Sequence, residues 1–304
     1  MIKILATDGM DKSAIAALQA KGCVVDVQFY EPDALCDALK EYDAVVVRSA
    51  TKVRHPQIDA AAEAGRLKMI IRGGVGVDNI DVDYAKEKGI IVKNTPRASS
   101  DAVAELALAH MFSVARFISI AGYTMREGKW EKKAYKGFEL GGKTVGIVGY
   151  GRIGQALGKR CQALGMKVLA YDVYQNKDLE CDTMKYVEMD ELLAKSDIIS
   201  LHVPSLPGNP MINADTIAKM KDGVVIINTS RGTNVDEQAL LDALNSGKVY
   251  GAGLDVYAEE PAKNSELYSH PKVSCTPHIG ASTNEAQKRI GAEIVDLIAD
   301  QFAL

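Results

Sequence analysis

Short apolar runs alternate along the chain with stretches in which apolar residues recur at helical spacing. The first apolar runs cover residues 4–6, 24–25, 44–47, 69–71 and 90–92. Helical patterns lie between them, over residues 13–20, 34–40 and 58–64. Strands that alternate with helices predict parallel sheets with right-handed crossovers, and runs that are apolar at every position indicate strands covered on both faces.

A second series of the same kind begins at Lys143. Its expected strands cover residues 144–149, 167–172, 198–203, 224–230, 249–256 and 273–277. A long helix, which Ser99 or Ser100 can cap, is expected from about residue 99 to 118, and the pattern then lapses over 121–142. A final helix is expected over 284–302, after the second series, where it is free to return to the first domain.

The length and the two series together predict two domains. A chain of 304 residues exceeds what one hydrophobic core usually supports. We expect an α/β protein with two doubly wound parallel-sheet domains, Rossmann-like or flavodoxin-like, and a cleft between them. The substrate domain is expected over 1–97 and 284–304, and the cofactor domain over 98–283.

Composition and charge narrow the class of protein. The formal net charge of −4 argues against a general nucleic-acid or anionic-membrane surface. No apolar run approaches the roughly 18 residues that span a bilayer, and the N-terminus lacks the pattern of a signal peptide. We therefore expect a cytoplasmic protein with no membrane or nucleic-acid partner. The five cysteines form no CxxC pair, so no metal site is predicted.

A GxGxxG motif follows the first strand of the second series. It comprises Gly149, Gly151 and Gly154, with Arg152 and Ile153 between the last two. Alone it could be a glycine-rich turn, but here a strand leads in, a helix leads out, and a second strand ends at Asp172, 18 residues after Gly154. The glycines let the backbone and the helix N-terminus approach a pyrophosphate, and the acid binds ribose hydroxyls while repelling a 2′-phosphate. The motif predicts NAD, in preference to NADP.

Three further residues at loop positions have the chemistry of carbonyl reduction. Arg231 follows a strand, Glu260 precedes Pro261, and His278 follows Pro277. A histidine can donate a proton to the carbonyl oxygen, a carboxylate beside it favours its charged form, and a guanidinium can hold a 2-oxo acid by two hydrogen bonds. These are the roles we assign to His278, Glu260 and Arg231 as catalytic residues.

Each of these residues also has a plain structural interpretation. Arg231 could support its own loop, Glu260 could be a solvated acid before a turn proline, and His278 could cap the last helix. Among the other histidines, His110 lies in an apolar stretch and is expected to be packed. His202 ends a strand before Pro204, where it could contact the cofactor.

Together these motifs resemble the D-2-hydroxyacid dehydrogenase family over essentially the whole chain. The similar stretches are the GxGxxG unit, Asn-Thr-Ser-Arg-Gly at 228–232, Leu-Asp-Val-Tyr at 254–257 leading to Glu260, and Pro-His at 277–278. The resemblance implies that Arg231, Glu260 and His278 form a catalytic triad. The cofactor contacts that we expect, besides the motif and Asp172, are Val75, His202, Val203, Pro204, Thr229, Ser230, Asp255, Gly280 and Ala281.

Within that family, four stretches resemble the D-3-phosphoglycerate dehydrogenases. They cover residues 47–53, 74–79, 128–130 and 278–283. The resemblance implies oxidation of D-3-phosphoglycerate, a phosphorylated 2-hydroxy acid, in the first step of the phosphorylated route to serine. The substrate contacts implied are Arg48 and Ser49 at a strand end, the backbone of Gly74, Val75 and Gly76, with Arg72 nearby, and Lys132 on an arm that would cross a homodimer. A solvated strand end and a solvated loop are the alternatives for Arg48 and Lys132.

Other assignments remain open on the same residues. The chain stops after its last predicted helix, so we expect a short form without a C-terminal regulatory domain and without serine feedback through one. Val75 stands where some relatives have threonine, which leaves only backbone contacts there. Reduction of glyoxylate or hydroxypyruvate, or a D-lactate-type reaction, would keep the chemistry and change the substrate. The same motifs would also be found in an NAD-sensing, corepressor-like protein that catalyses no reaction. They would likewise remain in an enzyme that has lost its activity.

Overall fold

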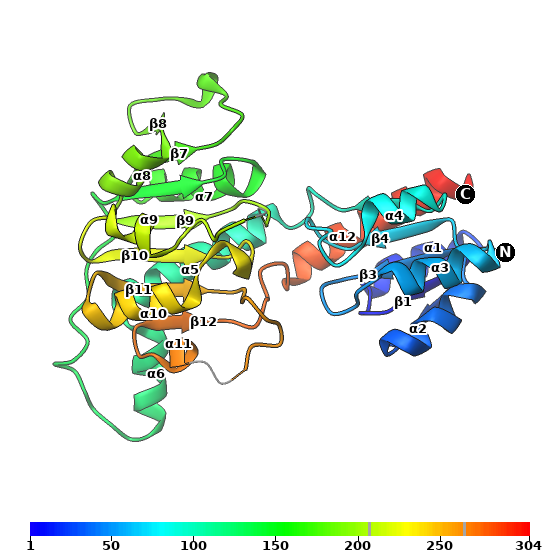
Figure 1. Cartoon of the computed structure of the whole chain (residues 1–304), viewed down its shortest axis with the longest axis horizontal. Helices are drawn as coiled ribbons and strands as arrows, with labels where there is room; N and C mark the ends of the chain where they lie inside the picture. The colour runs from blue at the N-terminus through cyan, green and yellow to red at the C-terminus, as the bar shows by residue number, and fades with distance from the viewer. Residues whose placement is uncertain (206–207, 264–265) are drawn as a thin grey trace. The chain divides into compact units, whose positions relative to one another are not determined.

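The chain divides into two compact units (Figure 1). The computed structural model describes residues 1–205, 208–263 and 266–304. Unit 1 comprises Met1–Ser99 and Ala281–Leu304, and unit 2 comprises Ser100–Gly280. The divisions between substrate and cofactor domains that the sequence pattern predicts are at 97/98 and 283/284.

Unit 1 is built on a five-stranded parallel sheet in the order β2-β1-β3-β4-β5. Its strands are β1 (Lys3–Ala6), β2 (Val24–Val27), β3 (Ala44–Val47), β4 (Met69–Arg72) and β5 (Ile91–Asn94). Its helices are α1 (Lys12–Ala20), α2 (Pro32–Ala38), α3 (His55–Ala64), α4 (Val82–Glu87) and α12 (Asn284–Phe302), with a 3₁₀ turn η1 (Leu39–Glu41). The first series of apolar runs is thereby confirmed strand by strand.

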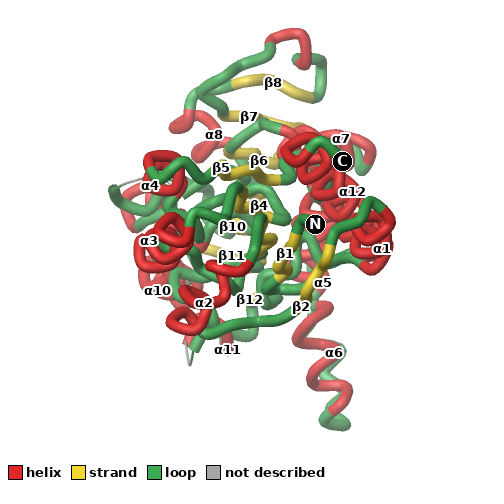
Figure 2. The backbone as a smooth tube through the Cα atoms, turned by 90° about the vertical axis from the view of Figure 1, so that its right-hand side faces the viewer, coloured by secondary structure: helices red, strands yellow, loops and turns green. Residues whose placement is uncertain are grey.

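The last helix belongs to the first unit because it packs against α1 (Figure 2). The two helices come so close that a Cβ atom on Gly291 would lie 2.8 Å from the Cβ atom of Ala14. The Thr283 hydroxyl caps α12 by accepting from the Ala286 N–H at 3.1 Å. The start of α12 is therefore set by Thr283, and the interpretation of His278 as its cap is wrong.

Unit 2 holds a seven-stranded parallel sheet in the order β12-β11-β10-β9-β6-β7-β8. The strands are β6 (Thr144–Val148), β7 (Lys167–Tyr171), β8 (Met184–Tyr186), β9 (Ile198–Leu201), β10 (Val224–Asn228), β11 (Val249–Leu254) and β12 (Val273–Cys275). The helices are α5 (Ser100–Arg116), α6 (Ile118–Arg126), α7 (Arg152–Ala163), α8 (Met189–Lys195), α9 (Ala214–Ala218), α10 (Glu237–Ser246) and α11 (Glu266–Ser269), with 3₁₀ turns η2 (Lys177–Leu179) and η3 (Gly232–Asn234).

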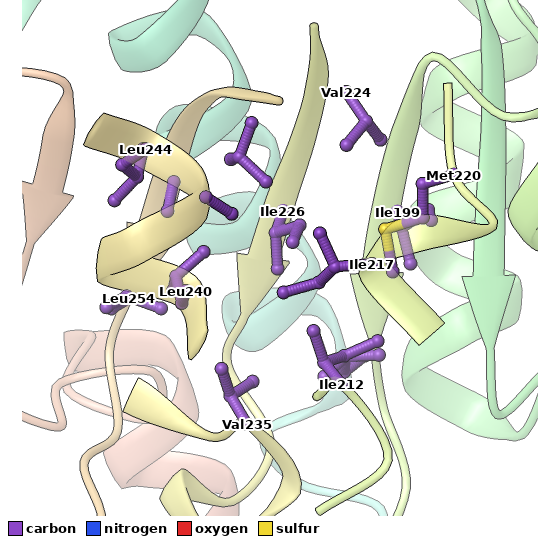
Figure 3. Packing of buried hydrophobic residues seen from close by; sticks show 14 of the residues in the cluster. Ile199, Ile212, Ile217, Met220, Val224, Ile226, Val235, Leu240, Leu244 and Leu254 are labelled. Carbon is purple, nitrogen blue, oxygen red and sulfur yellow. The ribbon is translucent and has the colours of Figure 1, made fainter. Parts of the chain in front are cut away.

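The central strands of unit 2 are buried on both faces. Along β10, Val224 and Ile226 pack in one apolar cluster with Ile212, Ile217 and Leu240 (Figure 3). The alternate residues Val225 and Ile227 belong to a second cluster, under α5 and α7. This is the two-sided burial that the uninterrupted apolar runs predict.

Three local features differ from the sequence-based expectation. Helix α5 ends at Arg116 because Phe117 adopts a left-handed backbone conformation with φ 56°. The chain then forms α6 over residues 118–126, which overlaps the stretch where the periodic pattern lapses. The short strand β8 was not expected; three residues are too few to show a period. No single helix in the described ranges is long and apolar enough to cross a membrane, and α5 with α6, bent by 65°, passes that test only as a pair.

Candidate functional site

The candidate cofactor site lies where the strand order of unit 2 reverses, between β6 and β9. Ligands of doubly wound sheets bind beyond the carboxyl ends of the strands at such a switch point. Gly149 follows β6 with φ 88°, and His202 follows β9. A Cβ atom on Gly149 would lie 2.5 Å from the backbone oxygen of His202, so only glycine lets these two segments of the chain approach each other here.

The other two glycines of the motif have different surroundings. A Cβ atom on Gly154, inside α7, would lie 2.2 Å from the Gly149 oxygen, so this glycine lets the helix pack on the loop. Gly151 precedes α7 directly, is exposed, and would place a Cβ atom in open space. Exposed Arg152 and half-buried Ile153 begin the helix. The helix N-terminus is thus open to an anion, as pyrophosphate binding requires.

The acid at the end of β7 is held against the glycine loop. One Asp172 oxygen accepts from the Tyr150 N–H at 2.7 Å, and the other accepts from the Tyr174 N–H at 2.9 Å. Each carboxylate oxygen can accept more than one hydrogen bond, so the charge stays available to ribose hydroxyls. The loop and the acid predicted from their spacing therefore lie together at one edge of the sheet.

Two buried polar atoms at this edge have no hydrogen-bond partner in the described part of the chain: Nδ1 of His202 and Oγ1 of Thr229. The other ring nitrogen of His202 lies 2.9 Å from the Ser200 hydroxyl, and burial lowers the pKa of His202 to about 4, which keeps the imidazole neutral. Orphaned buried polar groups are rare and costly. They fit a site that a polar ligand such as NAD completes, and His202 is the neutral histidine that such a contact needs. Val203 and Pro204 continue from it along the same edge.

Arg231 is placed by the carboxyl end of β10 and by a close backbone crossing. Asn228 donates a side-chain hydrogen bond to the Arg231 oxygen at 2.8 Å and accepts from the N–H and hydroxyl of Ser230. A Cβ atom on Gly232 would lie 1.9 Å from the backbone of Tyr257, so glycine lets the Arg231 turn reach the loop that carries Glu260. The positive charge of Arg231 also contributes to lowering the pKa of Glu260.

Glu260 and His278 form the central pair of the site. Oε2 of Glu260 lies 2.7 Å from Nδ1 of His278, and Oε1 accepts from the Tyr257 N–H at 3.2 Å. Burial acts to raise the pKa of Glu260, but His278, the Tyr257 N–H and the charge of Arg231 together outweigh it and hold this pKa below its ordinary value. The side chains keep 35% and 30% exposure, enough for a small molecule to reach them. The interpretation of Glu260 as a merely solvated acid is therefore wrong.

His278 sits on a strained loop that Asp255 holds in place. Its backbone φ is 52°, a left-handed conformation that costs a side-chain-bearing residue about 1 kcal/mol. The buried Asp255 carboxylate accepts from the Ile279 N–H at 2.8 Å and the Gly280 N–H at 2.9 Å, and the Asp255 backbone oxygen accepts from the His278 N–H at 2.8 Å. Burial raises the pKa of Asp255 above its ordinary value. Asp255 and Gly280 thus build the loop that carries His278, and their expected contacts with the cofactor stay a prediction.

The residues expected to bind substrate in unit 1 gather at its own switch point, between β1 and β3. Asp8 follows β1, and one of its oxygens accepts from the Arg48 N–H at 2.6 Å and the Thr51 N–H at 3.1 Å. The Asn79 amide donates to the backbone oxygens of Arg48 and Thr51, at 2.7 Å each. Asp8 and Asn79 therefore order the loop of Arg48 and exposed Ser49. Sequence reasoning gave neither residue a role, although Asp8 lies two residues after a predicted apolar run and Asn79 ends the similar stretch 74–79.

Of the other residues expected to bind substrate or cofactor, some lie at the ends of β4 and β5 and some lie elsewhere in the chain. Arg72 ends β4 and donates to the Gly73 oxygen at 2.8 Å, with its guanidinium against Gly74. The Val75 oxygen accepts from Asn94, at the end of β5, at 2.5 Å, and Gly76 follows it. Ala281 belongs to unit 1, where its oxygen accepts from Gln287. Lys132 is exposed in the coil after α6, and its role stays a prediction.

Comparison with known proteins gives a consistent match. The family model for "D-isomer specific 2-hydroxyacid dehydrogenase, NAD binding domain" matches residues 108–280. A hydroxypyruvate reductase of Thermotoga maritima is 48% identical over 308 residues, which cover 99% of this chain and 99% of the relative. A D-3-phosphoglycerate dehydrogenase of Methanocaldococcus jannaschii is 44% identical over 98% of this chain, but the chain spans only 57% of that relative's length.

Solved structures agree with this match. The TT0316 protein of Thermus thermophilus superposes with a TM-score of 0.88 at 32% identity, over 97% of this chain and 94% of that one. The D-lactate dehydrogenase of Aquifex aeolicus, complexed with NAD and lactic acid, superposes with a TM-score of 0.86 at 32% identity, over 99% of this chain and 95% of that one. The expected fold class and the expected NAD cofactor are thereby confirmed.

Proposed function

Because the chain belongs to the D-isomer specific 2-hydroxyacid dehydrogenase family, we propose that Arg231, Glu260 and His278 are its catalytic residues. The reaction class is the NAD-dependent interconversion of a D-2-hydroxy acid and a 2-oxo acid. The observation that carries the assignment is the 2.7 Å contact between Nδ1 of His278 and Oε2 of Glu260 at a part-exposed sheet edge. A histidine oriented by a carboxylate is suited to moving the proton that accompanies hydride transfer.

The contact also assigns the two ring nitrogens of His278. Nδ1 donates its hydrogen to Glu260, so Nε2 carries the lone pair that takes the substrate hydroxyl proton during oxidation. NAD, when bound, would supply the acceptor for the hydride that leaves the hydroxyl-bearing carbon of the substrate. Glu260 then stabilises the imidazolium, and Arg231 holds the substrate carboxylate and the developing carbonyl oxygen. In the reverse direction, His278 returns the proton to that oxygen.

The residues that would hold NAD lie along one edge of unit 2. The open backbone at Gly151 and the N-terminus of α7 would receive the pyrophosphate, and Asp172 the adenine-side ribose. The neutral His202 and the Thr229 hydroxyl would gain the partners that they lack within the described chain. The negative charge of Asp172 favours NAD over NADP, because it repels a 2′-phosphate.

For the substrate, we place D-3-phosphoglycerate first, with 3-phosphohydroxypyruvate as its product. Two features support it: the resemblance of residues 47–53 and the location of Arg48 at the switch point of unit 1. Reduction of hydroxypyruvate is the second candidate, and the 48% identity to a hydroxypyruvate reductase over both full lengths favours it. Asp8 also favours the second candidate, because its carboxylate already occupies the Arg48 and Thr51 amides and leaves the Arg48 side chain as the main anion-binding group.

We also propose a homodimer formed through α6. Figures 1 and 2 both show α6 projecting from the rest of its unit. Apolar side chains on and after it are half or more exposed: Ile118 57%, Tyr123 58%, Met125 53% and Trp130 78%. A second copy of this chain would cover them. Light scattering after size exclusion should give a dimer mass, and Met125→Glu with Tyr123→Glu should give a monomer.

The test of the activity follows NADH absorbance with purified protein and three 2-oxo acids. These are 3-phosphohydroxypyruvate, hydroxypyruvate and glyoxylate. A kcat/KM preference of about 100-fold for the phosphorylated acid, or about 2.7 kcal/mol, supports the first substrate. Similar rates on hydroxypyruvate and the phosphorylated acid favour the second candidate. Turnover of none of the three, with NAD still bound, would contradict the dehydrogenase proposal and favour an NAD-sensing protein.

A further inference from the structure

A buried histidine with no place in the proposed chemistry sits behind the catalytic loop. His110, on α5, has 2% of its surface exposed. Nε2 lies 3.0 Å from the Thr276 hydroxyl, and Nδ1 lies 3.0 Å from the Ser274 hydroxyl. The backbone of β11 makes room for the ring, because a Cβ atom on Gly253 would lie 2.5 Å from the Cβ atom of His110.

The hydrogen bonds on the Thr276 side of His110 run in one direction only. Asp255 is an acceptor when ionised, so the Thr276 hydroxyl donates to it, at 2.6 Å. The single hydroxyl hydrogen of Thr276 is then used in this bond, so Thr276 must accept a hydrogen bond from Nε2 of His110. The neutral imidazole therefore carries its hydrogen on Nε2, and Nδ1 accepts from Ser274. Burial lowers the pKa of His110 to about 4, in agreement with a neutral ring.

The chain of hydroxyls continues from Ser274 to the surface. The Ser274 oxygen lies 3.2 Å from that of Ser119, and the Ser119 oxygen lies 2.7 Å from that of Ser113, which is part-exposed. Each hydroxyl accepts from its outer neighbour and donates to its inner one. The order Ser113, Ser119, Ser274, His110, Thr276, Asp255 thus leaves no link without a hydrogen to donate.

The inner end of this chain is the residue that holds the His278 loop. Asp255 accepts from Thr276 and from the backbone N–H groups of Ile279 and Gly280. Those bonds help to hold the positive φ of His278, a backbone conformation that residues with a side chain rarely adopt. Without the His110 donor, the Thr276 hydroxyl is free to rotate away from Asp255, and the loop loses part of its anchor.

We propose that His110 is a positioning residue, which acts through Thr276 and Asp255 to hold His278 against Glu260. The proposal rests on the catalytic role assigned to His278 above. It requires the Nε2 donor of His110, whereas a residue that only fills space there would be replaceable by any side chain of similar volume.

The test compares two replacements of similar size. His110→Leu removes both ring nitrogens, and His110→Gln keeps a donor where Nε2 lies. We expect His110→Leu to lower kcat about 10-fold or more with little change in KM for NADH, because small displacements of a catalytic group are costly. His110→Gln should recover most of the turnover. His55→Leu, at an exposed histidine of unit 1, is the control for histidine loss in general.

Proton NMR of the Nδ1 hydrogen of His278 is the deciding measurement, and it needs no substrate. In His110→Leu the signal of this hydrogen should be lost to exchange with water, because a displaced ring loses its hydrogen bond to Glu260. Thr276→Val removes the hydroxyl that links His110 to Asp255 without touching the His110 ring, and should have the same effect even if His110→Leu fails to fold. A signal unchanged from the wild type in these variants overturns the inference. If the wild type turns over none of the 2-oxo acids tried, the proposed function is overturned instead. The NMR result then still decides whether His110 positions His278.

Discussion

The Nδ1 atom of His278 lies 2.7 Å from Oε2 of Glu260, although the two residues belong to different loops of unit 2. Gly232 and Asp255 bring these loops into place. The first lets the Arg231 turn touch the loop of Glu260, and the second anchors the loop of His278. The contact between Glu260 and His278 therefore depends on the loops that follow three strands, β10, β11 and β12.

Replacement of the carboxylate should lower the rate of reduction. In that direction His278 gives a proton to the substrate oxygen, and Glu260 stabilises its imidazolium form. Glu260→Gln removes the charged hydrogen bond between the two side chains, so kcat/KM for the 2-oxo acid should fall about 10-fold or more. Glu259→Gln, at the adjacent exposed acid, should keep the wild-type kcat/KM, and an equal fall in both variants would contradict the assignment.

Removal of the charge at Asp172 should relax the preference for NAD. Asp172→Asn keeps one of the two oxygens that accept from the Tyr150 and Tyr174 N–H groups, but it no longer repels a 2′-phosphate. We expect kcat/KM with NADH to fall about 10-fold, from loss of a charged hydrogen bond, while the value with NADPH rises. Asp178→Asn, in η2, is the matched control. If the ratio of kcat/KM with NADH to kcat/KM with NADPH does not change, Asp172 does not bind the ribose.

Arg48 should separate the two substrate candidates. If its guanidinium binds a phosphate, Arg48→Ala should lower kcat/KM for 3-phosphohydroxypyruvate by roughly 10–150-fold more than for hydroxypyruvate. Arg66→Ala controls for loss of an arginine in the same unit, since Arg66 pairs with Asp43 before β4 begins. Equal losses on both substrates would mean that Arg48 does not contact the phosphate.

The neutral state of His110 should make stability depend on pH. Its pKa is about 4 in the folded chain against an ordinary value of 6.5, so the unfolded chain binds more protons between these values. The free energy of unfolding should therefore fall as the pH is lowered from 6.5 towards 4. Between pH 7 and 5 the contribution is about 2 kcal/mol.

Guanidinium unfolding of the wild type and His110→Gln, followed by circular dichroism, isolates this contribution. Other titrating groups, His202 among them, are present in both chains and cancel. The stability advantage of the wild type over the variant should shrink by about 2 kcal/mol from pH 7 to pH 5. A difference that stays constant would show that folding does not lower the pKa of His110.

The repeating pattern of the sequence was enough to predict both parallel sheets, and motif spacing was enough to predict the glycine loop with Asp172. These features are local, because a buried strand needs only a short apolar run and a phosphate loop only a few glycines at set positions. The triad residues were predicted at loop positions, two of them directly after strands, together with a family resemblance. Their types and places in the chain carried that prediction without any geometry.

Only the tertiary structure decided how those residues are held. Asp8 below the Arg48 loop, the positive φ of His278, and the line from Ser113 through His110 to Asp255 join residues that are far apart in the sequence. From the sequence, His110 is expected to be a packed residue of a helix, and the structure confirms that it is buried. Its role as a donor appears only when α5 crosses the ends of β11 and β12, because a hydrogen bond depends on the distance between atoms and leaves no period in the chain.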